Sequence, residues 1–137
     1  MAYWLMKAEP DDYSFADLER DGVASWDGVR NHQAARNMRA MKVGEQAFFY
    51  RSQVDPAVVG VMEIAREAYE APDDPRRSFV LVDVRPVAQV REEVSLKAIK
   101  AEPRLAHLPL VRQSRLSVSE VDEDAWRLIR SMAGLAD

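Results

Sequence analysis

Residues 2–7 read AYWLMK, a short apolar run that ends shortly before Pro10. Apolar runs with aromatic residues that stop near a proline predict a β-strand. The run lacks the basic region and the long apolar stretch of a signal peptide. Nothing elsewhere approaches the ~20 consecutive apolar residues of a membrane span. We therefore expect a strand over residues 2–7 in a cytoplasmic protein that has no membrane partner.

Two helices are predicted beyond this strand. Ser14 and Asp17 have the spacing of a capping box, which predicts a short helix through Arg20 that is closed by Gly22. Residues 25–28 read as a polar turn. Asn31 is a good N-cap for a second helix over residues 32–41, in which the apolar positions at helical spacing are Ala34, Ala35, Met38 and Met41.

The rest of the chain alternates short strands with two more helices. Aromatic and β-branched residues predict strands at 46–50, 57–65, 78–87 and 116–118, with residues 71–77 as an exposed loop. Ser95 caps a short helix that stops before Pro103, and Asp122 begins the last helix, with an apolar face of Trp126, Ile129 and Met132 and with Gly134 as its terminator. The pattern predicts an α+β fold, with a small, mostly antiparallel, barrel-like sheet and flanking helices.

Length and composition limit the function classes. The 137 residues suit one domain over residues 1–137, with 47% hydrophobic and 31% charged residues. The chain has no cysteine, which excludes thiolate chemistry and Cys-ligated metals. His32 and His107 are isolated, so we expect no metal and no cofactor. We also expect a monomer.

Charge is unevenly distributed along the chain. The formal net charge of −4 argues against a protein that coats nucleic acid by bulk electrostatics. Residues 26–53 nevertheless carry five basic and two acidic side chains, a net +3, and residues 104–118 carry three arginines and no acid. Residues 9–22 carry six acids and one arginine, a net −5. The two basic segments either converge into one patch or are separate solvated surfaces.

Trp26 is the best candidate for stacking on a planar ligand. An extruded base needs a flat apolar face together with polar groups for its hydrogen-bonding edge. Trp26 lies in a polar turn before a helix, where a purely structural tryptophan is less expected, although a core plug beneath the helix is the alternative. Trp126 lies on an amphipathic helix and reads as core, and Trp4 is intermediate. Asn31 either caps its helix or reads a base edge.

Several polar residues would complete such a pocket. Arg30 and Arg36 at a helix start favour phosphate, unless they are simply solvated. Tyr50 and Ser52 are two residues apart on a strand, as are Arg115 and Ser117, so each pair either shares a face of a site or belongs to ordinary sheet surface. The hypothesis requires Trp26, Tyr50 and Ser52 to line one pocket with a basic rim.

The chain resembles the EVE domain family in an ordered set of blocks. These blocks are Trp4 to Pro10, Tyr13-Ser14, Trp26 to Asn31, Ala35-Arg36-Asn37, Met41 to Gly44, Phe48 to Ser52 and Arg115 to Val118. The resemblance implies a PUA-like fold related to YTH and ASCH domains. It also implies a pocket for a modified nucleobase in DNA or RNA, such as a methylated or hydroxymethylated cytosine.

Two departures from the family pattern concern this pocket. Arg51 stands where the family often has histidine, and a longer insertion with a tryptophan is missing before the strand that begins near Phe79. The partner predicted from the residues and the resemblance together is a nucleic acid or a modified nucleotide. The predicted base-binding residues are Lys7, Trp26, Arg30, Asn31, Arg36, Tyr50, Arg51, Ser52, Arg115 and Ser117.

Two other functions stay open. Lys7 and Glu9 are two residues apart, and a lysine beside a carboxylate suits acid–base or amide-hydrolysing chemistry. A nucleoside amidohydrolase like those of the related ASCH group is therefore the first alternative to a non-catalytic base reader, although a simple ion pair is the commoner explanation of such a spacing. A protein-interaction module is the second alternative.

Overall fold

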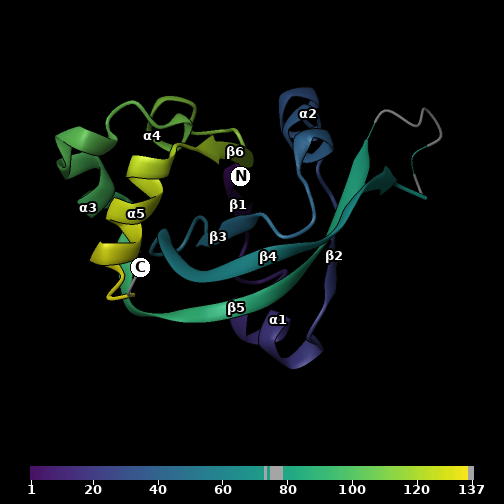
Figure 1. The fold of residues 1–137 in the computed structure, drawn as a ribbon, viewed down its shortest axis with the longest axis horizontal. Coiled ribbons are helices and arrows are strands. Elements are labelled where there is room, and N and C mark those ends of the chain that lie inside the picture. Colours follow the sequence, from purple (N-terminus) through teal and green to yellow (C-terminus); the bar gives the residue numbers. More distant parts are fainter. Residues whose placement is uncertain (73, 75–78, 136–137) are drawn as a thin grey trace.

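A computed structural model describes residues 1–72, 74 and 79–135. Its sheet has six strands in the order β2-β5-β4-β3-β1-β6, and β4 and β5 form a long curved ribbon (Figure 1). Neighbouring strands are antiparallel except β1 and β3, which run parallel. The strand bounds are Tyr3–Ala8 (β1), Ala24–Trp26 (β2), Gln46–Arg51 (β3), Ala57–Glu70 (β4), Val80–Ser95 (β5) and Val118–Val121 (β6). The predicted α+β, mostly antiparallel architecture is confirmed.

The helices begin at side-chain caps that the sequence predicts. Ser14 and Asp17 form a complete capping box at α1, and Asn31, Ser95 and Asp122 each accept a hydrogen bond from a backbone N–H in the first turn of the helix that follows. The bounds are Phe15–Asp21 (α1), His32–Ala40 (α2), Leu96–Ala101 (α3), Pro109–Arg112 (α4) and Glu123–Met132 (α5), with a 3-10 turn at Pro103–Leu105 (η1).

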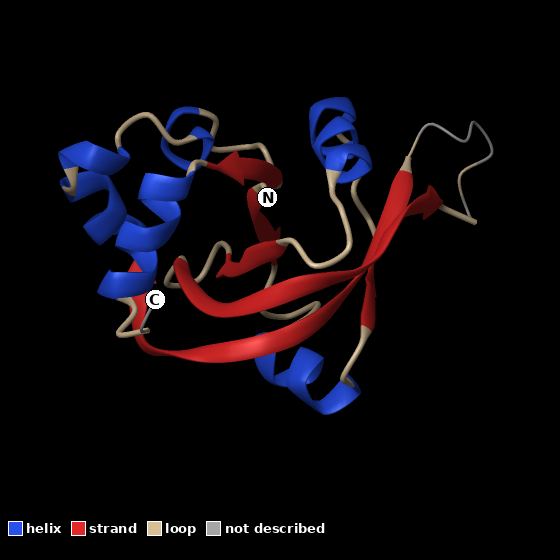
Figure 2. Ribbon diagram, in the orientation of Figure 1, coloured by secondary structure: helices blue, strands red, loops and turns tan. Residues whose placement is uncertain are grey.

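The sheet buries apolar side chains on both faces. Successive residues of β1 alternate between two core clusters, with Trp4 and Met6 in one and Leu5 in the other. The first cluster also contains residues of α1 and α2, and the second contains residues of α3 and α5. Figure 2 shows α3, α4 and α5 gathered at one end of the ribbon, away from α1 and α2. Strands buried on both faces explain why the sequence shows apolar runs with little alternation.

Glu45 anchors the start of the sheet from within the core. The Glu45 side chain is 5% exposed and accepts hydrogen bonds from the Trp4 indole (3.0 Å) and from the backbone N–H groups of Ala2 and Lys42 (both 2.8 Å). Burial alone raises the pKa of Glu45, but these three donors outweigh it and hold the pKa below its ordinary value. This carboxylate therefore connects β1 to the turn that precedes β3.

Several predicted strand bounds were wrong. The strands predicted at 57–65 and 78–87 continue to Glu70 and Ser95 as the paired ribbon of β4 and β5, and Ser78 itself lies outside the described residues. The strand predicted at 116–118 lies instead at Val118–Val121, where it pairs with β1. Most of the loop predicted at 71–77 also lies outside the described residues.

The polar turn predicted at 25–28 was wrong in its first half. Ala24–Trp26 forms β2 and pairs with β5, where Trp26 lies opposite Val82. The sequence also gave no indication of η1 or of α4. Pro103 and Pro109, which read as helix breakers, stand at the first turns of these elements, where a missing N–H costs nothing. None of the helices in the described ranges is long and apolar enough to cross a membrane.

Candidate functional site

One cavity of about 520 Å³ opens beside the end of β1 and the start of α2. We name it the Trp26 hollow. Its volume falls within the ~300–1,000 Å³ range of small-molecule sites. It brings together residues from three segments of the chain: Lys7, Ala8, Glu9, Asp12 and Tyr13; the run Ser25 to Arg30; and Ser117.

Trp26 lies at the inner wall of this hollow. Its side chain is only 7% exposed and belongs to the core cluster that includes Phe49, whose ring meets the indole edge to face at 5.4 Å and 83°. The expected uncovered stacking face is therefore corrected: Trp26 is a core residue with a small exposed part that faces a cavity. The core interpretation and the pocket interpretation both describe part of its environment.

Lys7 stands between the Trp26 hollow and a second hollow of about 300 Å³, and lines both. We name the second one the Lys100 hollow. The Lys7 amine donates a hydrogen bond to the carbonyl oxygen of Ser114 (2.9 Å) and lies 5.8 Å from the centre of the Tyr50 ring. Burial lowers the pKa of Lys7 below its ordinary value.

Lys7 and Glu9 do not form the ion pair that their spacing suggests. In the described part of the chain, the Lys7 amine bonds to Ser114, whereas a carboxylate oxygen of Glu9 accepts a hydrogen bond from the side-chain amide of Gln53 (2.9 Å). Both side chains nevertheless line the Trp26 hollow. The two groups that the amidohydrolase alternative needs therefore face the same cavity.

Tyr50 and Ser52 line the Lys100 hollow, on the other side of Lys7 from Trp26. The expectation that Trp26, Tyr50 and Ser52 share one pocket is corrected to two adjacent hollows. The cause is the parallel register of β1 and β3, which places Lys7 opposite Tyr50. Tyr50 is 3% exposed, and the Ser52 hydroxyl donates to the carbonyl oxygen of Ala8 (3.1 Å).

The predicted residues at the start of α2 have separate environments. Arg30 lines the Trp26 hollow, with its guanidinium 5.4 Å from the centre of the Phe79 ring and one N–H donated to the carbonyl oxygen of Val29 (3.1 Å). Asn31 caps α2 by accepting from the backbone N–H of Ala34 (2.9 Å). Arg36 is exposed on α2.

Arg51, which replaces the histidine of the family pattern, is engaged within the protein. Its guanidinium forms a two-point ion pair with the Glu93 carboxylate (2.7 and 2.9 Å) and donates to the carbonyl oxygens of Val54 and Asp55. Hydrogen bonding to Glu93 raises the pKa of Arg51 and lowers the pKa of Glu93. Arg51 thus holds the turn between β3 and β4 against β5.

Ser117 and Arg115 differ in position. Ser117 is half-buried, lines the Trp26 hollow, and its carbonyl oxygen accepts a hydrogen bond from the backbone N–H of Lys7 (2.9 Å). Arg115 is exposed in the turn that precedes it. Of the ten predicted residues, the structure therefore brings four to the Trp26 hollow: Lys7, Trp26, Arg30 and Ser117.

Residue-by-residue reasoning missed an acidic part of the Trp26 hollow. Asp12 and Asp27 line it together with Glu9, so three carboxylates face two cations, and the predicted purely basic rim is corrected to a mixed lining. Tyr13 also lines the hollow. Burial, followed by a hydrogen bond to Asp21 (2.8 Å), raises the pKa of Tyr13 to about 12, so the phenol stays protonated. Asp27 and Tyr13 lie within the sequence blocks that resemble the EVE family, and this position was the one indication in the sequence that they belong to the site.

Ser25 connects the same hollow to the ribbon. Its hydroxyl lies 2.9 Å from the Tyr69 hydroxyl and donates to Asp83 (3.1 Å), and Tyr69 also donates to Asp83. The guanidinium of Arg66 lies 3.7 Å from the centre of the Tyr69 ring. This polar cluster joins β2, β4 and β5 beside Trp26, and no sequence pattern indicated it.

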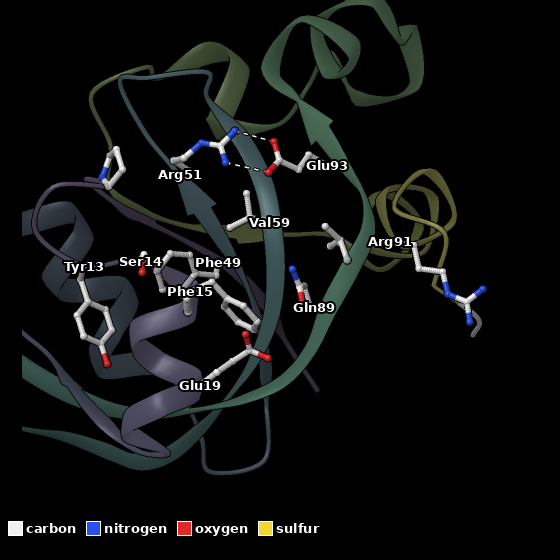
Figure 3. A pocket seen from close by; sticks show the side chains of 13 residues that line it. Tyr13, Ser14, Phe15, Glu19, Phe49, Arg51, Val59, Gln89, Arg91 and Glu93 are labelled. Carbon is white, nitrogen blue, oxygen red and sulfur yellow. Dashed lines mark hydrogen bonds and ion pairs between the residues drawn. The ribbon is translucent and has the colours of Figure 1, made fainter.

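A third hollow, of about 370 Å³, lies between α1 and the β4–β5 ribbon. Figure 3 shows Phe15 and Phe49 close together beside Val59, with the Arg51–Glu93 ion pair at one side. Its charged residues are Glu19, Arg51, Arg91 and Glu93, which balance to zero. Tyr13 lines both this hollow and the Trp26 hollow. Because Arg51 is already paired with Glu93, this hollow offers less to a charged ligand than the Lys7 region does.

The sheet topology and the flanking helices define a PUA-like α+β protein with a cavity at the end of its first strand. The model of the EVE domain matches residues 2–132, and the chain belongs to the EVE domain family. Thymocyte nuclear protein 1 of Mus musculus is 32% identical over 166 aligned positions, which cover 95% of this chain and 73% of the mouse protein.

Solved structures agree with this membership. A protein from Agrobacterium tumefaciens is 39% identical with a TM-score of 0.95, covering 100% of this chain and 96% of that one. The human THYN1 protein, solved in complex with DNA that contains 5-methylcytosine, is 28% identical with a TM-score of 0.91, covering 100% of both chains. An ASCH protein from Zymomonas mobilis, 10% identical with a TM-score of 0.58 and covering 95% of this chain and 97% of its own, shares the fold alone.

Proposed function

We propose that this domain is a non-catalytic reader of a modified cytosine in DNA, and that the Trp26 hollow receives the base. The observation that carries the proposal is the convergence of Lys7, Trp26, Arg30 and Ser117 on one cavity of about 520 Å³. The similarity to the human THYN1 protein, solved with DNA that contains 5-methylcytosine, supports the same ligand class. Among nucleic acids, DNA is therefore favoured over RNA.

The lining of the Trp26 hollow suits the chemistry of cytosine. The exocyclic amino group of cytosine is a hydrogen-bond donor, and Asp or Glu is its usual acceptor in proteins. Glu9, Asp12 and Asp27 provide such acceptors, and the Lys7 amine provides a donor for the ring nitrogen or carbonyl. Trp26 and Val29 provide apolar surface against which a C5 substituent can pack.

The same lining disfavours a phosphate in this hollow. Three carboxylates against two cations repel an anion, whereas a neutral base with a donor edge gains from an acceptor. A base that enters the hollow must leave the helical stack, which costs a few kcal/mol and is recovered by hydrogen bonds and packing inside the cavity. The proposed role is thus to hold one extruded base.

A steric plug tests this proposal without relying on any one contact. Ser117→Phe places a ring at the half-buried edge of the hollow, and Ser131→Phe makes the same change at an exposed position of α5. The measurement is fluorescence anisotropy with matched duplexes that carry one 5-methylcytosine or one cytosine. We expect the wild type and Ser131→Phe to prefer the methylated duplex and Ser117→Phe to lose that preference while remaining folded by circular dichroism. A plugged variant that discriminates as well as the wild type would place the base elsewhere.

One observation favours a second candidate function. Lys7 and Glu9 both line the Trp26 hollow, which an amidohydrolase acting on N-acylated cytidine would require. Its test is the release of a small acid from N-acetylcytidine, with Lys7→Ala inactive. Hydrolysis by the wild type that Lys7→Ala abolishes would replace the reader by an enzyme. If the domain shows neither activity and still retains a protein partner on pull-down after nucleic acid is digested away, it would instead be an interaction module.

A further inference from the structure

The Lys100 hollow differs in charge from the Trp26 hollow beside it. Its lining contains two cations, Lys7 and Lys100, and no carboxylate. The Trp26 hollow contains three carboxylates and two cations, and Lys7 belongs to both. Two adjacent cavities that share one lysine therefore have opposite balances of charge, and they suit different parts of one ligand.

Lys7 is prepared for an anion on the Lys100 side. Within the described ranges its amine has no carboxylate at ion-pair distance, and its hydrogen bond goes to the neutral carbonyl oxygen of Ser114. A half-buried ammonium without a counter-ion is destabilised by desolvation, as the lowered pKa of Lys7 indicates. An anion that docks here would supply the missing negative charge and stabilise the protonated amine.

Gln53 links the two hollows physically. Its side chain lines the Lys100 hollow, while its amide nitrogen donates to Glu9, which lines the Trp26 hollow. The Gln53 backbone is held at a positive φ of 69°, in the turn that Arg51 fixes through its bonds to Val54 and Asp55. The wall between the hollows is thus built from tied residues, and the two cavities keep a defined relation to each other.

We propose that the Lys100 hollow is a phosphate subsite, which binds the phosphodiester next to the base held in the Trp26 hollow, with Lys7 and Lys100 as its cations. The proposal rests on the proposed function. Each nucleotide carries one negative charge, and an acid-free cavity with two lysines complements it. The Trp26 hollow, rich in carboxylates, and the Lys100 hollow, whose charged residues are lysines, would together orient the DNA strand. A strand bound in the reverse direction would place its phosphate among the carboxylates.

Lys97 provides a matched control for Lys100. Both lysines are exposed, lie three residues apart on α3 and line a neighbouring hollow that also contains Asp55 and Glu93, but Lys100 alone of the two lines the Lys100 hollow. Lys100→Gln and Lys97→Gln remove the same charge from the same helix. A difference between them therefore reports on the Lys100 hollow and not on the net charge of the protein.

The experiment measures the salt dependence of binding to the duplex with one 5-methylcytosine. We expect Lys100→Gln to reduce the slope of log K against log salt by about 1 and to weaken methylated and unmethylated duplexes by the same factor, since phosphate contacts carry no base information. Lys97→Gln should keep the wild-type slope. An unchanged slope for Lys100→Gln, or an equal loss for Lys97→Gln, would overturn the phosphate subsite.

A second arm separates failure of the subsite from failure of the reader. The free nucleoside 5-methyl-2′-deoxycytidine has no phosphate, so Lys100→Gln should leave its binding, followed by NMR chemical shifts, unchanged. If the wild type binds both the nucleoside and the duplex, and Lys100→Gln leaves the salt dependence of duplex binding unchanged, the subsite is wrong and the reader stands. If neither ligand binds the wild type, the reader and the subsite both fail. If the wild type binds an acidic peptide and not DNA, and Lys100→Gln loses the peptide, the hollow belongs to a protein partner and the phosphate subsite is wrong.

Discussion

The ring of Phe15 lies against the backbone of Gly60, so closely that a Cβ on Gly60 would stand 2.4 Å from the ring. Phe15 is the first residue of α1, and Gly60 lies in β4, where the register with β3 and β5 shifts. Phe15 also packs edge to face on Phe49 at 5.4 Å. This contact fixes α1 on the sheet, beside the segment that forms one wall of the Trp26 hollow.

Gly60→Ala should therefore destabilise the protein, because the added methyl group overlaps a buried ring. Overpacking of this kind costs about 1–3 kcal/mol. Urea unfolding followed by circular dichroism measures the loss. Phe15→Leu in the Gly60→Ala background should recover part of it relative to the sum of the two single changes. Strict additivity of the two single changes would show that the ring and the glycine do not interact.

Glu45 should make the stability of the fold depend on acidic pH. Because its folded pKa is lower than the ordinary value of 4.5, the carboxylate contributes stability above that value and loses the contribution as pH falls through the folded pKa. Glu45→Gln should cost about 1–3 kcal/mol at neutral pH, since an amide cannot accept from all three donors as well. Unfolding free energies at a series of pH values below 6 compare the variant with the wild type. An equally steep acid loss in both proteins would assign the dependence to other carboxylates.

The sequence predicted α1, α2, α3 and α5 and the existence of most strands, because caps and apolar runs are local signals. It failed at the ends of β4 and β5, where polar residues such as Arg66 and Glu70 extend a strand only because the partner strand pairs with them. It failed at Trp26 for a similar reason: β2 is a three-residue strand that exists through its pairing with β5. Tertiary pairing overrides local preference at these positions.

The candidate site was predicted in part. The family resemblance gathered Lys7, Trp26, Arg30 and Ser117, and these residues line one hollow. The division into two hollows depends on the register of β1 against β3, which no local pattern encodes. The opposite charge balances of the two hollows follow from that register, and they became visible only in three dimensions.

Binding to DNA should weaken with rising pH before an ordinary lysine would deprotonate. Burial lowers the pKa of Lys7 in the free protein, so its ammonium is lost at a lower pH than the ordinary value for lysine implies. Tyr50, whose ring lies 5.8 Å from the Lys7 amine, has a pKa that burial raises, so its phenol does not compete with Lys7 as the group that titrates first. Anisotropy between pH 7 and about 10 measures the loss.

Lys7→Arg is the control for this pH dependence. A guanidinium stays protonated throughout the range, so the variant should bind with a flatter pH profile even if its geometry lowers the affinity. A profile as steep as that of the wild type would show that another group titrates. The protein's unfolding temperature at each pH separates a loss of binding from a loss of fold.

Trp26→Ala should unfold the protein's first core cluster and is therefore unsuited to testing base binding. The indole is 7% exposed and packs on Phe49, so its truncation leaves a cavity worth about 3–5 kcal/mol, similar to the loss expected for Trp126→Ala in the second cluster. Trp26→Phe keeps much of the packing and removes only part of the wall of the hollow. If the exposed part of the indole contacts the base, Trp26→Phe should weaken binding to the methylated duplex, while Trp126→Phe, which faces no hollow named above, should lose stability alone. Equal binding by both phenylalanine variants, measured after correction for the folded fraction, would assign Trp26 to the core and leave the base to the polar lining.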